Sequence, residues 1–257
     1  MTIVGKAVAA PRNSTREETA IQGFVNSNLA PGPLRRQAAP LLESKELLQT
    51  IRRLTPENQT KFLEKVDQVC HDSWHYDGLF FPLEILPSPK VYSTLDSRNA
   101  KFITALGNAC SATGRLPTST TLSVGLEKHG NIAEDSGGAT DIWRGEFHGT
   151  HVAIKAFRIH PARDLEEAKR VCAQYPSDVR CRTNLQIIWK RVPMWMRLSH
   201  ENIMPFRGVN TTLFQLALVY DWGQNGNVNQ YIASHPGASR QSLVRKTLVT
   251  VAAAVNY

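Results

Sequence analysis

The residues most able to do chemistry lie in one short run, Val152-Ala153-Ile154-Lys155. Its apolar residues predict a β-strand, and on a strand Ala153 and Lys155 share one face. A lysine on an otherwise apolar strand is costly to desolvate without an anionic partner, and a phosphate group supplies one. The run therefore predicts a lysine that binds phosphate, with a lysine that only reaches solvent as the alternative.

A glycine-bearing turn precedes this lysine in the sequence. Gly137 and Gly138 lie in the run Glu134-Asp135-Ser136-Gly137-Gly138-Ala139-Thr140-Asp141. Backbone amides of such a turn can approach phosphates closely, because glycine carries no side chain. The same two glycines could instead serve only a hairpin turn. Their spacing to Lys155 is what favours a role in phosphate binding.

The residue pattern after Gly130 predicts a sheet that would position both features. We expect strands over 142–147 and 151–157, a helix over 183–198, strands over 203–208 and 214–221, and an apolar helix over 241–257. Because one helix interrupts the strands, the pattern predicts an antiparallel sheet with a helix packed on it, which is an α+β fold.

The residues before this sheet predict helices and no chemistry. Residues 1–40 are rich in Pro, Ala, Ser, Asn and Gly without a lasting period, so we expect a mobile leader. Residues 41–129 are expected to form a helical extension. Within it, one helix should begin at Pro56, where a proline suits the first turn, and another should cover roughly 97–112.

Further runs follow in the second half: LSHENI (198–203), FRGV (206–209), LVYDWG (218–223), NGNVNQYI (225–232) and VAAAVNY (251–257). Together with the glycine turn and Lys155, they make residues 130–257 resemble the first half of a eukaryotic protein kinase domain. The resemblance is to the tyrosine-kinase-like branch common in mushroom-forming fungi. It implies a kinase-like N-lobe followed by the start of the helical C-lobe.

The resemblance also implies an ATP site made of a glycine loop, a phosphate-pairing lysine, and a gatekeeper and hinge. The residues implied there are Gly137, Gly138, Ile142, Ala153, Lys155, Tyr220, Asp221 and Gly223. Asp221 and Gly223 would offer backbone groups to adenine. ATP is the implied cofactor, and Mg²⁺ is implied only together with family residues that come later in the domain.

The sequence departs from the family pattern around this site. Asp135 and Thr140 stand where the family has glycines, and Asp135 adds a negative charge near the phosphates. Arg191 stands where the family has the glutamate that pairs with the lysine. Pro193, two residues later, is expected to bend or break that helix.

The family's catalytic loop, H-R-D-x-x-x-x-N, and its D-F-G motif would follow Tyr257, and residues 222–257 contain no Asp or Glu. These motifs supply the base and the metal ligands of phosphoryl transfer. We therefore expect no catalysis by this chain alone. Two alternatives remain open: a pseudokinase-like binding module, and a helical protein-interaction module unrelated to nucleotides.

The composition argues against several classes of function. The net charge of +8 over 257 residues is spread along the chain, so no basic block predicts nucleic-acid binding. No apolar run reaches ~18 residues, so no membrane partner is expected. The four cysteines form no CxxC pair, which predicts reduced thiols, no metal site and an intracellular, cytoplasmic protein. Protein partners are expected on the helical extension or on an exposed C-terminal helix.

Overall fold

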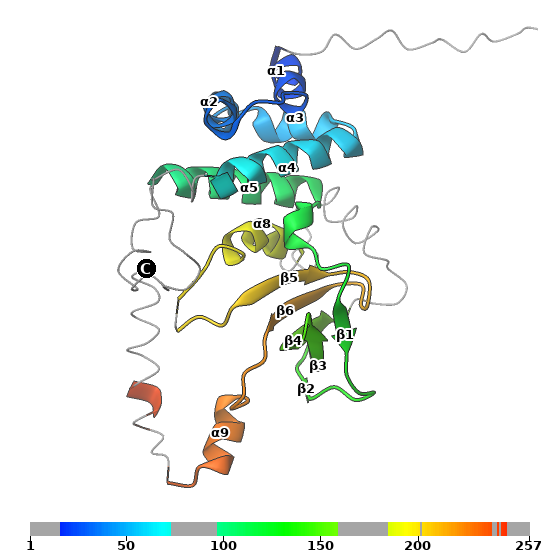
Figure 1. Ribbon diagram of the computed structural model, residues 1–257, viewed down its shortest axis with the longest axis vertical. Coiled ribbons are helices and arrows are strands. Elements are labelled where there is room, and N and C mark those ends of the chain that lie inside the picture. Colours follow the sequence, from blue (N-terminus) through cyan, green and yellow to red (C-terminus); the bar gives the residue numbers. More distant parts are fainter. Residues whose placement is uncertain are drawn as a thin grey trace, which may run out of the picture.

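The computed structural model describes residues 16–72, 97–158, 185–200, 202–237, 241 and 243–245. The chain has a mixed α+β fold in which the helices of the first part stand above an antiparallel sheet (Figure 1). Of the helix predicted over 241–257, residues 241 and 243–245 are helical and the rest lies outside the described residues.

The helices of the first part are α1 (Arg16–Val25), α2 (Pro31–Leu42), α3 (Leu47–Arg53), α4 (Pro56–Asp72) and α5 (Ser97–Thr113). The two helices predicted from Pro56 and over 97–112 are confirmed as α4 and α5. The Thr55 hydroxyl accepts the Asn58 backbone N–H at 3.3 Å, so a side-chain cap and a first-turn proline fix where α4 begins.

Residues 16–40, expected to belong to a mobile leader, form α1 and most of α2 instead. The side chains of Ile21, Phe24 and Leu34 are fully buried, and the Phe24 ring meets the Phe62 ring of α4 edge to face at 5.7 Å. The expectation is wrong here because it used local composition alone. Burial against α4 supplies the stability that such short helices lack by themselves. Residues 1–15 lie outside the described residues.

The strands are β1 (Leu126–Lys128), β2 (Asp135–Ser136), β3 (Thr140–Phe147), β4 (Thr150–Phe157), β5 (Phe206–Asn210) and β6 (Ala217–Asp221). They pair antiparallel in the order β1-β3-β4-β6-β5, with β2 also paired to β3. Helix α8 (Leu185–Trp195) lies between β4 and β5 in the chain, and α9 (Val228–Ser234) follows β6. The predicted strands and the helix between them are confirmed, and β1 joins the sheet although it precedes residue 130.

One apolar core runs through both parts of the molecule. It joins buried side chains of α1–α5 to Ile188, Trp189 and Val192 of α8, and then to Val209 and Leu218 of the sheet. A smaller core lies on the other side of the sheet and contains Leu126, Val152, Ile154, Ala156, Ala217 and Val219. Because α8 is packed between α5 and β5, the helical part and the sheet share their largest core (Figure 1).

Two contacts hold α8 against the helical part. A Cβ atom added at Gly107 of α5 would lie 2.3 Å from the Lys190 carbonyl oxygen of α8, so the two helices approach as closely as glycine allows. Just after α8, the Arg197 guanidinium is 2.6 Å from the Asp67 carboxylate of α4, and their side chains are 11% and 8% exposed. The ion pair therefore joins segments 130 residues apart inside the protein.

Burial also determines the reactivity of the two cysteines that the structure describes. Cys70 and Cys110 are buried in the larger core, and burial raises the pKa of Cys70 to about 12. Both are inert structural side chains because the reactive form of cysteine is the thiolate. Cys172 and Cys181 lie outside the described residues. Among the helices that the structure describes, none is long and apolar enough to cross a membrane.

Candidate functional site

The sheet places four of the eight predicted site residues on one face. Ile142 of β3 lies opposite Lys155 of β4, and Ala153 of β4 lies opposite Tyr220 of β6. Residues directly opposite each other across antiparallel strands point to the same face. Alternation along β4 then places Ala153 and Lys155 together. The predicted shared face of Ala153 and Lys155 is confirmed, and the strand register adds Ile142 and Tyr220 to it. The role of these four residues in binding stays a prediction.

Lys155 is half-buried in the middle of this face. Its strand neighbours are Ile142 on one side and Leu218 on the other, both apolar. Within the part of the chain that the structure describes, no carboxylate forms an ion pair with Lys155. A lysine with apolar neighbours on both adjacent strands and no described carboxylate partner is suited to an anionic ligand.

Helix α8 carries the two departures expected near this lysine. Arg191, in the place expected for a glutamate, is exposed on α8. Pro193 is buried in the last turn of α8, and the helix ends at Trp195. The helix continues through Pro193 to Trp195, so the expected break inside it is not observed.

The glycine turn connects β2 to β3. The Gly137 N–H donates to the Thr140 carbonyl at 2.8 Å, which closes the turn. A Cβ atom at Gly138 would meet nothing within 4 Å, and one at Gly137 would meet atoms no nearer than 3.7 Å. Neither glycine has a positive φ. The fold therefore does not require glycine at either position, unlike Gly145, where a Cβ would lie 2.4 Å from a backbone oxygen.

An ion pair fixes the end of this turn. The Arg158 Nε–H donates to Asp141 Oδ2 at 2.9 Å, and the Ser136 hydroxyl donates to Asp141 Oδ1 at 2.7 Å. These hydrogen bonds, led by that from Arg158, lower the pKa of Asp141 to about 2. The Arg158 backbone N–H also donates to the Ala139 carbonyl at 3.0 Å, so the pair ties the turn to the end of β4.

We expect the Asp141 carboxylate to stay ionised well below its ordinary pKa of 3.8. Because the pKa of the folded state is depressed, the stabilisation from this pair is complete above about pH 4 and is lost as the pH falls through about 2. An NMR titration of the Asp141 carboxyl carbon measures it, and Arg158→Gln should move the midpoint back toward 3.8. A wild-type midpoint near 3.8 would contradict the ion pair.

The predicted hinge residues follow β6. The Asp221 N–H donates to the Pro205 carbonyl at 3.1 Å, and its carboxylate binds the Arg207 guanidinium at 2.5 and 2.8 Å. Proline has no N–H with which to return the second hydrogen bond, so the backbone group that Asp221 can offer a ligand is its carbonyl. The Gly223 N–H has no hydrogen-bond partner among the described residues. One acceptor and one donor are thus placed two residues apart.

Tyr220 connects this face to the larger core. Its ring lies 5.2 Å from the Phe206 ring, and both side chains pack against the cluster that contains α8. Burial raises the pKa of Tyr220 above its ordinary value, so the phenol is neutral at neutral pH. Tyr220 is therefore a packing residue at the inner edge of the face.

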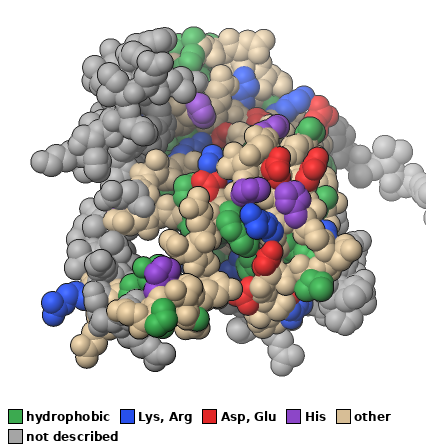
Figure 2. Space-filling model, turned by 60° about the horizontal axis from the view of Figure 1, so that its bottom comes forward, with side chains coloured by type: hydrophobic (Ala, Val, Ile, Leu, Met, Phe, Trp, Pro, Cys, Tyr) green, Lys and Arg blue, Asp and Glu red, His purple; other side chains and the backbone are tan. Residues whose placement is uncertain are grey.

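Charged residues that sequence reasoning missed continue the same face beyond Ala153. Glu127 lies opposite Glu146 and Glu146 opposite His151, while Arg144 lies opposite Ala153. Figure 2 views the end of the molecule with the sheet and α9, where histidine, acidic and basic side chains gather. Alternation counted from Lys155 along β4 would have found His151, whereas Arg144, Glu146 and Glu127 are placed on this face only by the register of β3 and β1. Within the described residues, no three His, Cys, Asp or Glu side chains are placed to hold a metal ion.

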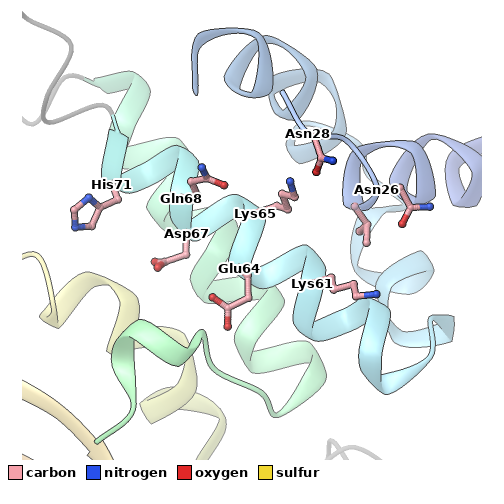
Figure 3. A pocket seen from close by; sticks show the side chains of 9 residues that line it. Asn26, Asn28, Lys61, Glu64, Lys65, Asp67, Gln68 and His71 are labelled. Carbon is pink, nitrogen blue, oxygen red and sulfur yellow. The ribbon is translucent and has the colours of Figure 1, made fainter. Parts of the chain in front are cut away.

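A polar cavity of about 640 Å³ lies apart from this face, between α4 and the connection from α1 to α2 (Figure 3). Its charged groups already have partners. Lys65 points toward that connection and donates to the Ser27 carbonyl, whereas Glu64 points the opposite way and accepts the Thr118 N–H at 2.8 Å. Because these contacts are structural links between neighbouring segments, the sheet face is the better candidate for a ligand-binding site.

No protein-family model matches the chain, and no curated protein matches it. The function therefore has to be inferred from the chemistry of the residues on the sheet face.

Proposed function

We propose that residues 126–237 bind an adenine nucleotide as a kinase-like N-lobe does, and that residues 1–257 alone transfer no phosphoryl group. The observation that carries the proposal is the half-buried Lys155 on the same face as Ile142, Ala153 and Tyr220. An antiparallel sheet with a helix inserted between β4 and β5 is also what the resemblance to protein kinases implies.

The hinge supports the adenine end of the proposed site. Adenine presents a donor and an acceptor along one edge, and a strand end can match them with a backbone carbonyl and N–H. Asp221 can offer a carbonyl, and Gly223 has an N–H without a described partner. Ala153, opposite Tyr220 on the neighbouring strand, leaves room for a flat ring because its side chain is a single methyl group.

The glycine turn supports the phosphate end. Packing and backbone conformation do not explain Gly137 and Gly138, since side chains at both would be tolerated. A ligand that approaches the backbone closely would explain them. Residues 222–257 contain no Asp or Glu, so they supply neither the base nor the metal ligands of a kinase. Nucleotide binding is therefore the function that these residues favour.

Replacing Lys155 by methionine tests the proposal. We expect affinity for ADP, measured by calorimetry in EDTA at low salt, to fall about tenfold or more, as for loss of a charge-assisted hydrogen bond. Lys128→Met is the matched control, because Lys128 lies over the Trp143 ring at 4.2 Å and opposite Gly145, on the other face of the sheet. It should leave the affinity unchanged.

Gly138→Ala separates ligand binding from folding. The melting temperature should stay the same or rise slightly, because an added methyl group meets no atom and reduces the freedom of the unfolded chain. The affinity for ADP should fall. The proposal is overturned if the wild-type protein binds neither adenosine nor any adenine nucleotide saturably, or if Lys155→Met and Lys128→Met behave alike.

A further inference from the structure

Two aspartates flank the glycine turn, and their surroundings differ. The charge of Asp141 is neutralised by Arg158. Asp135 is held at both oxygens by uncharged donors: its Oδ1 accepts the Ser136 N–H at 2.8 Å, and its Oδ2 accepts the Asn227 side-chain N–H at 3.4 Å. Within the described part of the chain, no basic side chain pairs with Asp135. Its negative charge therefore has two neutral hydrogen-bond donors and no described basic partner.

The position of Asp135 relates this charge to the proposed site. Asp135 lies opposite Ile142, which lies opposite Lys155, so all three share one face and one row across the strands. Adjacent strands are about 4.8 Å apart, which puts the backbones of Asp135 and Lys155 about 10 Å apart. Asn227 lies four residues after Gly223, so the contact from Asp135 spans from the glycine turn to the segment beyond the hinge.

We propose that Asp135 is a specificity-determining residue that weakens the binding of nucleotides with more phosphates, so that the affinity for a nucleoside triphosphate relative to a monophosphate is lower than it would be without this charge. The inference rests on the proposed nucleotide site. Lys155 is a single cation, whereas each further phosphate adds negative charge within reach of Asp135. Over about 10 Å of water, Coulomb repulsion weakens binding about twofold per unit charge at low salt. ATP carries about two charges more than AMP, which corresponds to about fourfold.

Asn227 is the positioning residue for this carboxylate. Its side-chain oxygen accepts the Gln230 N–H at 3.0 Å and so caps α9, while its side-chain N–H reaches Asp135. Serine caps a helix about as well as asparagine but is too short to reach Asp135. Asn227→Ser therefore releases the carboxylate without removing the cap, and it should reproduce part of the effect of removing the charge.

The test compares the affinities of adenosine, AMP and ATP for the full chain in EDTA, at about 20 mM and about 200 mM salt. The variants are Asp135→Asn, Asn227→Ser and, as a remote loss of one negative charge, Glu57→Gln. Asp135→Asn should raise the affinity for ATP relative to AMP about fourfold at low salt, less at high salt, and leave adenosine unchanged. Asn227→Ser should raise the ratio less, and Glu57→Gln should not change it.

The outcomes separate this inference from the proposed function. If neither the wild-type protein nor any variant binds adenosine or AMP, the nucleotide site itself is refuted. If these ligands bind but the ratio of ATP to AMP affinity is the same for wild type, Asp135→Asn and Asn227→Ser, the specificity role of Asp135 is refuted and the nucleotide site stands. Thermal melting of each variant confirms that the compared proteins are folded.

Discussion

Replacing Asp67 by alanine should lower the free energy of unfolding by about 3–5 kcal/mol, as for other buried ion pairs that lose one partner. The Asp67 carboxylate accepts from the Arg197 guanidinium at 2.6 Å and from the Ser119 hydroxyl at 2.7 Å. Figure 3 shows its side chain directed from α4 away from the helices α1 and α2. Without it, the Arg197 charge would remain in a site where its side chain is 11% exposed.

Urea denaturation measures this loss as a shift of the midpoint. Glu57→Ala is the control, because Glu57 and Lys61 form a pair of similar length, 2.6 Å, at the surface, where such pairs contribute little. The double variant Asp67→Leu/Arg197→Met should be more stable than Asp67→Ala, since it leaves no buried charge unpaired. Equal midpoints for Asp67→Ala and Glu57→Ala would show that the buried pair does not hold the two parts together.

Gly107→Ala should destabilise the protein by about 1–3 kcal/mol, the usual cost of overpacking. Inside a helix this substitution normally stabilises by about 1 kcal/mol. Here the new Cβ atom would lie 2.3 Å from the Lys190 carbonyl oxygen and 3.3 Å from its carbon. Both are backbone atoms that cannot rotate away, so α5 and α8 would have to move apart and loosen the core between them.

Gly23→Ala is the matched control. Gly23 is an exposed residue of α1, and a Cβ there would meet no atom within 4 Å. This variant should be as stable as the wild type or slightly more stable, by up to about 1 kcal/mol. Urea denaturation of the two variants side by side therefore gives changes of opposite sign. If both shift the midpoint in the same direction, the close approach of α5 to α8 is refuted.

The sequence alone predicts those elements whose signals are local. The cap and first-turn proline at Thr55 and Pro56 determine the start of α4, and the alternation of apolar residues around Lys155 indicates β4 and its faces. The same alternation places Ala153 on the face of Lys155. Such signals suffice because they depend on residues no more than about four positions apart.

The sequence could not predict the structure of segments in which packing against distant residues outweighs local composition. Residues 16–40 contain prolines and small residues, and only their burial against α4 makes them helices. Gly107 carries no local sign that its missing side chain admits Lys190 of another helix. In both cases the deciding atoms belong to segments far away in the chain.

The sequence by itself thus determined the class of fold, the sheet that carries Lys155, and the residue types available for an anionic ligand. The tertiary structure decided which charges are compensated. It paired Asp67 with Arg197 across 130 residues and brought Asn227 to Asp135 across 92. The physical reason is that the energy of a charge depends on burial and on its nearest partners, and both are set only when distant segments pack together.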